Sequence, residues 1–230
     1  MKRVLTGIVQ EDPPIEVPWL DHTEYRLETR SKGIDWPSRA HSMIGLRRLD
    51  NVQHCIEEVL QSGIPGDLAE AGVWRGGTTI FMRAVLQAYG VIDRAVWVAD
   101  SFQGLPASAG WPQQQALAVT EEQVRHNFGL YGLLDTQVKF LPGWFDNSLP
   151  DAPIKQLAVL RLDGDLYESQ LAVLTHLYPK LSPGGFVIID DPQLAGCQQA
   201  IQEYRHSQKI SEAIRSVDGY AVYWQKAKQP

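Results

Sequence analysis

The chain contains the stretch Leu157-Ala158-Val159-Leu160-Arg161-Leu162-Asp163-Gly164-Asp165, an apolar run that ends in two aspartates. A second run, Phe186-Val187-Ile188-Ile189-Asp190-Asp191, has the same arrangement. Short apolar runs bounded by turn signals are typical of buried parallel strands. Ligands of open α/β sheets bind outside the carboxyl ends of the strands. If the two strands are neighbours, their aspartates therefore converge on one edge of the sheet.

Carboxylates gathered at one edge repel one another unless a cation lies between them. Hard oxygen ligands suit Mg²⁺ or Ca²⁺, so the two clusters predict a metal site. A simpler interpretation stays open for each cluster. Asp163 and Asp165 can be ordinary acids of a turn, whereas Asp190 and Asp191 can cap the helix that follows them.

Strand and helix signals alternate on both sides of these runs, which predicts an α/β fold with a mostly parallel sheet and helices on both faces. The pair Asp218-Gly219 indicates an antiparallel hairpin at one edge of the sheet. The predicted strands are residues 67–73, 95–99, 137–141, 157–162, 185–189, 213–217 and 220–224. The predicted helices are residues 42–60, 78–89, 120–128, 168–181 and 197–206, and residues 101–119 form a long connection and a candidate lid.

The length of 230 residues fits one α/β domain with a small N-terminal extension. Residues 1–41 contain prolines and isolated aromatics without a sustained period, so we expect an N-terminal arm or lid, followed by one domain over residues 42–230. Trp19 and Trp36 are candidates for lining a substrate lid, but packing of the arm on the domain is the favoured interpretation.

The composition excludes several classes of function. With 21 basic and 27 acidic residues the net charge is −6, which argues against a nucleic-acid-binding protein. Cys55 and Cys197 are far apart and have no metal-ligand spacing, as expected of a reduced, cytoplasmic chain. No apolar stretch approaches the length of a membrane span. We therefore expect a soluble protein with no nucleic-acid or membrane partner.

The segment from Glu70 to Thr78 reads Glu-Ala-Gly-Val-Trp-Arg-Gly-Gly-Thr and connects the first predicted strand to a helix. Glycines allow the backbone to approach a ligand closely, and the helix supplies free N–H groups. Asp100 ends the next strand, where it can accept hydrogen bonds from ribose hydroxyls. The dinucleotide spacing is absent, and Glu70 would repel a pyrophosphate but can hold an amine. This pattern favours S-adenosylmethionine over NAD, and a tight turn without a ligand is the alternative.

Four segments together resemble the macrocin O-methyltransferase family: residues 66–77, 97–106, 162–169 and 177–191. The resemblance runs from about Met43 to residue 205. It implies a Rossmann-like class I methyltransferase fold with a seven-stranded sheet that uses S-adenosylmethionine and Mg²⁺. Family members methylate sugar hydroxyls of natural products, so the implied partner is a glycosylated small-molecule acceptor, and a homodimer or higher homo-oligomer is expected.

Carried over by position, the resemblance assigns a role to each residue of these motifs. Asp163, Asp190 and Asp191 are implied as metal ligands and Asp165 as the general base. The implied cofactor-binding residues are Glu70, Gly72, Val73, Trp74, Arg75, Gly76 and Gly77 for the methionyl part, Asp100 for the ribose, Ser101, Phe102, Trp144 and Phe145 around the adenosine, and Asp163. Pro192 stands where the family often has an aromatic residue, so the acceptor side is expected to differ.

The leading functional prediction is methylation of a vicinal diol, with a sugar as its carrier. A second interpretation keeps the cofactor and metal but places a catechol or another non-sugar hydroxyl in the site. An aromatic sandwich over the metal would favour the catechol, and an open polar cleft would favour the glycoside. A non-catalytic module that binds S-adenosylmethionine is less favoured because all four aspartates are intact. A dehydrogenase is the least favoured.

Overall fold

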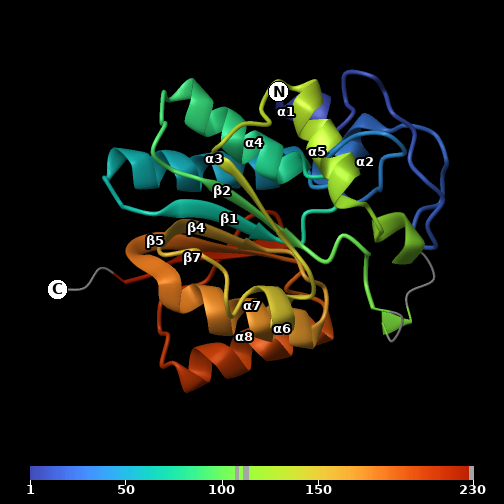
Figure 1. Cartoon of the computed structure of the whole chain (residues 1–230). Coiled ribbons are helices and arrows are strands. Elements are labelled where there is room, and N and C mark those ends of the chain that lie inside the picture. Colours follow the sequence, from blue (N-terminus) through green and yellow to red (C-terminus); the bar gives the residue numbers. More distant parts are fainter. Residues whose placement is uncertain (107–108, 111–113, 228–230) are drawn as a thin grey trace.

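Within residues 1–106, 109–110 and 114–227, which the computed structural model describes, the chain forms a seven-stranded sheet in the order β3-β2-β1-β4-β5-β7-β6 (Figure 1). Strands β1 to β5 run parallel, and β7 and β6 pair antiparallel at one edge. The strands are β1 (Asp67–Ala71), β2 (Val96–Asp100), β3 (Val138–Pro142), β4 (Leu157–Leu162), β5 (Leu181–Asp190), β6 (Arg215–Ser216) and β7 (Ala221–Gln225).

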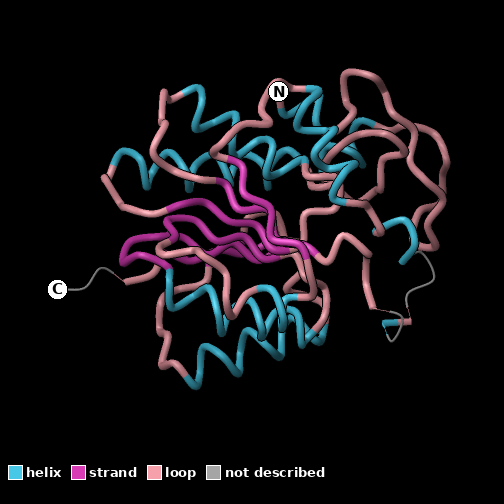
Figure 2. Tube along the Cα trace, viewed as in Figure 1, coloured by secondary structure: helices cyan, strands magenta, loops and turns pink. Residues whose placement is uncertain are grey.

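Helices cover both faces of the sheet, as Figure 2 shows in outline. Helices α1 to α5 lie on one face and α6 to α8 on the other (Figure 1). They are α1 (Lys2–Leu5), α2 (Leu27–Lys32), α3 (Leu46–Gln61), α4 (Gly77–Ala88), α5 (Glu121–Leu130), α6 (Phe145–Ser148), α7 (Tyr167–Leu177) and α8 (Ala195–Ser207), with short 3₁₀ turns at Gln114–Leu117 and Tyr178–Lys180.

Alternate residues of the central strands enter two separate hydrophobic cores. Leu68, Val98 and Ile188 pack towards α3 and α4, whereas Leu160 and Val187 pack towards α7 and α8. Apolar residues on both faces explain why these strands appear in the sequence as continuous apolar runs. The predicted fold class is therefore confirmed, including the C-terminal hairpin at the sheet edge.

The order of the strands creates the place where a ligand can bind. The chain adds β2 and β3 on one side of β1 and then returns to add β4 and β5 on the other side. A crevice forms at such a reversal, outside the carboxyl ends of the strands. Because β4 and β5 pair directly, the aspartates that follow them do meet at one edge, as the sequence predicts.

Several boundaries differ from the sequence prediction. The helix predicted over residues 168–181 ends at Leu177, since Pro179 has no N–H to continue the helical hydrogen bonds. Strand β5 consequently begins at Leu181, four residues before its predicted start. The short helix α6 was not predicted, and β6 has only two residues. Of the predicted long connection, residues 107–108 and 111–113 lie outside the described residues.

The arm, residues 1–41, contains a buried ion pair in its own interior. Arg30 and Asp35 have fully buried side chains, and Arg30 Nε lies 2.8 Å from Asp35 Oδ1. The same guanidinium donates to the carbonyls of Thr6 and Asp12. The arm therefore has a hydrogen-bonded interior although its sequence shows no period.

Across the described residues, no helix is long and apolar enough to cross a bilayer.

The arm offers a test of this buried pair. Arg30→Met should lower the free energy of unfolding by about 3–5 kcal/mol, because it leaves the Asp35 carboxylate buried and unpaired. Lys32→Met on the same helix is the matched control, since its ion pair with Glu28 is exposed, and it should leave stability nearly unchanged. Urea unfolding followed by circular dichroism measures both. Equal stability of the two variants would contradict the role of Arg30.

Candidate active site

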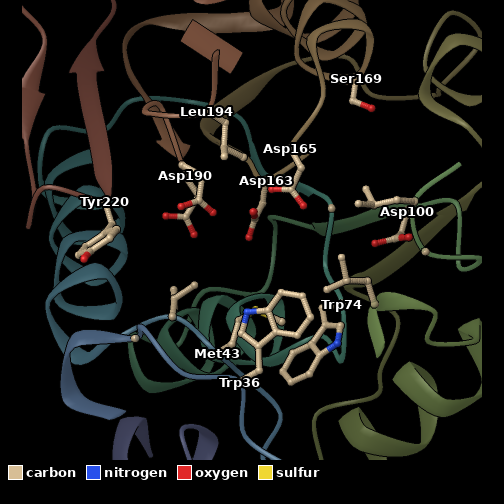
Figure 3. A pocket seen from close by; sticks show the side chains of 18 of the residues that line it. Trp36, Met43, Trp74, Asp100, Asp163, Asp165, Ser169, Asp190, Leu194 and Tyr220 are labelled. Atoms are coloured by element: carbon tan, nitrogen blue, oxygen red, sulfur yellow. The ribbon is translucent and has the colours of Figure 1, made fainter. Parts of the chain in front are cut away.

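A cavity of about 600 Å³ opens at the carboxyl ends of β1, β2, β4 and β5 (Figure 3). It collects side chains from the predicted motifs, from the arm and from the turn between β6 and β7. The predicted site residues that line it are Gly72, Trp74, Asp100, Ser101, Trp144, Phe145, Asp163, Asp165, Asp190 and Asp191. The structure thus brings both aspartate clusters to one cavity. The same cavity is lined by part of the turn formed by residues 72–77 between β1 and α4, which we call the glycine turn.

Gly72 makes the close approach of β1 and β4 possible at the floor of this cavity. Its φ is +86°, and a Cβ there would lie 1.9 Å from the carbonyl oxygen of Asp163. The neighbouring backbone supports the same contact, because the Asp163 N–H donates to the Ala71 carbonyl at 2.8 Å. A glycine at this position is therefore required by space as well as by conformation.

Asp100, at the end of β2, holds the glycine turn in place. Its Oδ2 accepts from the Val73 N–H at 2.7 Å and its Oδ1 from the Phe102 N–H at 2.8 Å. Burial raises the pKa of Asp100, while these backbone donors act in the opposite direction. Oδ1 also accepts from the Ser101 hydroxyl at 3.4 Å, and Asp100 lines the cavity. The residue can accept a ligand hydroxyl as well.

Asp163, Asp165 and Asp191 form the tightest group of acids, with one oxygen from each within 4.8 Å of the others. Asp165 and Asp191 have φ values of +57° and +50°, in the left-handed region that few residues other than glycine adopt. Such strain persists only where the surroundings impose it, and it is frequent at functional sites. The group offers the hard oxygen donors that Mg²⁺ prefers.

Burial and mutual repulsion raise the pKa values of this group. Burial raises the pKa of Asp191 to about 7, and the charges of Asp190 and Asp163 add to the rise. Burial also raises the pKa of Asp163 to about 6, against the effect of Arg161. The pKa of Asp165 lies well above its ordinary value, because of burial and then the charges of Asp163 and Asp191. A cation between the three carboxylates would relieve this repulsion.

Asp190 lies beside this group and is held differently. Its Oδ1 accepts from Arg48 at 3.1 Å, and its Oδ2 accepts from Arg161. All three side chains are almost completely buried. The two arginines therefore fix the orientation of this carboxylate.

Arg161 is a buried cation near the carboxyl end of β4. It pairs with Glu70 on the adjacent β1, with Asp163 at 2.9 Å and with Asp190. Burial lowers the pKa of Arg161, but the three carboxylates more than offset this and raise it. Burial raises the pKa of Glu70 to about 8, against Arg161. Glu70 thus lies beneath the cavity, where its carboxylate faces Arg161.

Some predicted cofactor-binding residues do not line the cavity: Glu70, Val73, Arg75, Gly76, Gly77 and Phe102. Arg75 points to the other side of the glycine turn, where it donates to the carbonyls of Pro37 and Ala40 in the arm. Phe102 is buried and packs near Phe140. In this structure these residues shape the turn and its surroundings.

The sequence prediction also missed residues of the site. Arg161 could have been found from the sequence, because an arginine inside the apolar run of β4 is a buried charge that needs partners. Arg48 had no such signal, because it meets Asp190 across 142 positions of the chain. Trp19 and Trp36, which we expected to pack the arm on the domain, line the cavity and pack edge-to-face at 5.2 Å.

Comparison with known proteins agrees with this geometry. The family model described as Macrocin-O-methyltransferase (TylF) matches residues 8–226. The chain belongs to the macrocin O-methyltransferase family. Members of this family are S-adenosylmethionine-dependent methyltransferases, so the chain is an O-methyltransferase of this class. The resemblance seen in the four segments is confirmed.

Individual macrocin O-methyltransferase relatives match over nearly the whole chain. An 8-demethyl-8-(2,3-dimethoxy-alpha-L-rhamnosyl)-tetracenomycin-C 4'-O-methyltransferase from Streptomyces olivaceus is 53% identical, over 97% of this chain and 90% of the relative. A mycinamicin III 3''-O-methyltransferase from Micromonospora griseorubida is 45% identical, over 99% of this chain and 94% of the relative. The solved structure of the O-methyltransferase NovP superposes with a TM-score of 0.91 at 49% identity, covering 98% of this chain and 96% of NovP.

The close contact of Gly72 with the Asp163 carbonyl in this O-methyltransferase can be tested through the free energy of unfolding. Gly72→Ala should cost at least about 3 kcal/mol, because left-handed strain adds to a clash with the Asp163 carbonyl. Gly63→Ala is the control, since Gly63 has a similar φ of +61° with nothing within 4 Å of its added Cβ, and should cost only about 1–2 kcal/mol. Thermal unfolding of both variants measures the difference. A Gly72 variant no less stable than the control would contradict the steric argument.

Proposed function

We propose that this O-methyltransferase requires Mg²⁺ and methylates a hydroxyl of a sugar vicinal diol on a glycosylated natural product. The observation that carries the proposal is the shared cavity of the glycine turn and the acid group Asp163, Asp165 and Asp191. An activated methyl donor and a metal-held acceptor would then lie within one space. The names of the relatives support the substrate class, since the tetracenomycin enzyme acts on a rhamnosyl-bearing compound.

The cofactor is proposed to bind over the glycine turn. Gly72 leaves room for close approach of a ligand, Asp100 can accept from ribose hydroxyls, and Trp144 and Phe145 offer flat apolar surfaces to an adenine. S-adenosylmethionine supplies a methyl group already activated on a sulfonium. The protein therefore has to position the acceptor oxygen and remove its proton.

Asp163 and Asp191 are the proposed metal ligands on which motif and geometry agree. The third ligand differs between the two: the family resemblance implies Asp190, whereas the distances between carboxylate oxygens indicate Asp165. A bound Mg²⁺ would hold two neighbouring hydroxyls and lower their pKa. Asp190 retains free lone pairs beside its arginine contacts, so it can serve as a ligand without leaving them.

Asp165 is the proposed general base. The Asp165 carboxylate would take the proton of the acceptor hydroxyl, and S-adenosylmethionine, bound over the glycine turn, would supply the methyl group. A base of raised pKa suits this role better than an ordinary aspartate, provided that it is ionised when the acceptor binds. Alignment of the two reacting atoms contributes the rest of the rate enhancement.

A catechol acceptor is the second candidate, and one observation favours it. Figure 3 shows the rings of Trp36 and Trp74 across the cavity from the aspartates. Aromatic faces bind planar rings, but they also bind the apolar faces of sugars. The rhamnosyl group in the name of a relative supports the glycoside.

Two matched variants separate the base from a ligand. Asp165→Asn and Asp191→Asn change the same group at left-handed positions, which asparagine tolerates well. We expect Asp165→Asn to bind Mg²⁺ and S-adenosylmethionine normally and to lose about 10²–10⁴-fold in turnover. Asp191→Asn should lose Mg²⁺ binding itself. Calorimetry and methylation assays measure both, and weakened Mg²⁺ binding in Asp165→Asn would make Asp165 a ligand instead.

The substrate class is tested with a panel of acceptors in the presence of Mg²⁺ or EDTA. A rhamnosylated tetracenomycin represents glycosides, and 3,4-dihydroxybenzoate represents catechols. Metal-dependent methylation of a glycoside alone is the expected result. Methylation of the catechol alone would replace the proposed substrate class, and full activity in EDTA would exclude the metal.

Light scattering of the same protein tests the proposed homodimer or higher assembly.

A further inference from the structure

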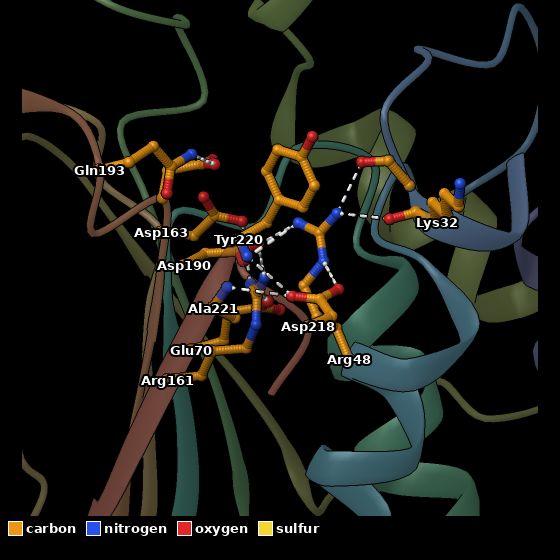
Figure 4. A network of polar contacts seen from close by, with 12 residues as sticks. Lys32, Arg48, Glu70, Arg161, Asp163, Asp190, Gln193, Asp218, Tyr220 and Ala221 are labelled. Atoms are coloured by element: carbon orange, nitrogen blue, oxygen red, sulfur yellow. Dashed lines mark hydrogen bonds and ion pairs between the residues drawn. The ribbon is translucent and has the colours of Figure 1, made fainter. Parts of the chain in front are cut away.

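Arg48, on α3, contacts three segments that are far apart in the sequence (Figure 4). Its Nη1 donates to Asp190 at the end of β5, 3.1 Å away. Its Nη2 donates to the carbonyls of Lys32 and Gly33 in the arm, at 3.1 and 2.6 Å. Its Nε lies 3.2 Å from Asp218 Oδ2, in the turn between β6 and β7. Only a planar guanidinium reaches three directions in this way.

All three segments contribute to the lining of the cavity, through Gly33, Asp190 and Tyr220. The arm supplies Trp19, Ile34 and Trp36, and the turn between β6 and β7 supplies Tyr220. The same turn also holds the acid group, because the Tyr220 carbonyl accepts from the Asp191 N–H at 2.9 Å. Loosening of either segment would therefore disturb the position of Asp190 or Asp191.

The backbone shape of the arm explains why Arg48 can reach it. Gly33 ends α2 with a φ of +64°, and a Cβ there would lie 2.1 Å from the backbone nitrogen of Gly45. A Cβ on Gly45 would in turn lie 2.5 Å from the Lys32 carbonyl carbon. This glycine contact brings the arm carbonyls to the first turn of α3, where Arg48 lies.

Burial shows that Arg48 is more than a surface salt bridge. The exposed fractions of the Arg48, Asp190 and Asp218 side chains are 6%, 2% and 7%. A buried charge that loses its partners is costly, so arm, turn and Asp190 hold Arg48 as much as it holds them. Seating of the arm is then energetically linked to the orientation of Asp190.

We infer that Arg48 is a positioning residue that links the arm and the β6–β7 turn to Asp190, so that seating of the arm and binding of a cation by the acid group support each other. The inference deepens the proposed function and rests on it for the cation. By reciprocity, if the seated arm strengthens Mg²⁺ binding, Mg²⁺ must keep the arm seated.

Limited trypsin digestion measures arm seating directly, through cleavage after Arg26 and Lys32 detected by mass spectrometry. In the full-length wild type, we expect Mg²⁺ to slow this cleavage. Without Mg²⁺, Arg48→Met should raise the cleavage rate roughly tenfold, the size of coupling through a contact network, because cleavage follows the population of the open arm. Mg²⁺ should no longer protect the arm in this variant.

Matched variants separate positioning from charge and from folding. Arg47→Met changes the adjacent exposed arginine and should behave as the wild type. Arg48→Lys keeps the charge without the guanidinium fork and should still lose protection. Gly33→Ala unseats the arm while Arg48 is intact and should also raise cleavage. Far-UV circular dichroism with the intensity of the wild type confirms that each variant is folded.

Three results would overturn the inference. One is cleavage of Arg48→Met at the wild-type rate. Another is protection of the arm by Mg²⁺ that persists in Arg48→Met. The third is tighter Mg²⁺ binding in Arg48→Met together with wild-type cleavage and protection in Arg48→Lys, because the charge of residue 48 alone would then account for the change. If Mg²⁺ does not bind the wild type by calorimetry, the proposed metal fails. The cleavage rates without Mg²⁺ still decide whether Arg48 seats the arm.

Discussion

Repulsion among buried and half-buried carboxylates at the sheet edge is the constraint around which the rest of the structure is arranged. Asp163, Asp165, Asp190 and Asp191 lie together there, with Glu70 beneath them. Arg161 and Arg48 are placed among these acids, and each is almost completely buried. Neither set can be buried without the other, because an unpaired buried charge is far more costly than a paired one. The site is therefore part of what holds the domain together.

The two arginines offset only part of the negative charge at this edge. Asp163, Asp165 and Asp191 remain close together with raised pKa values. The negative charge that these three acids retain suits a divalent cation. The left-handed backbone at Asp165 and Asp191 shows that the carboxylates are held near one another at a conformational cost.

Much of the fold could be predicted from the sequence because buried parallel strands are visible as apolar runs, and the acids that end them must share an edge. The apolar runs before Asp163 and Asp190 predicted two such strands and placed these aspartates at their carboxyl ends. Arg48 and the arm could not be predicted in the same way, since their contacts join distant parts of the chain and leave no local period. Strand β5 begins earlier than predicted because the helix before it ends ahead of Pro179, which leaves the residues from Leu181 onward to the strand. Roles of individual acids depend on distances that the sequence does not contain.

The backbone contact between Gly33 and Gly45 has a consequence for engineering. The arm brings Trp19 and Trp36 to the cavity, so exchanging it between relatives is an obvious way to transplant acceptor preference. Such a chimera can dock only if both positions lack a side chain, one on the transplanted piece and one on the recipient. Compatibility of donor and recipient thus depends on two glycines where one backbone meets the other.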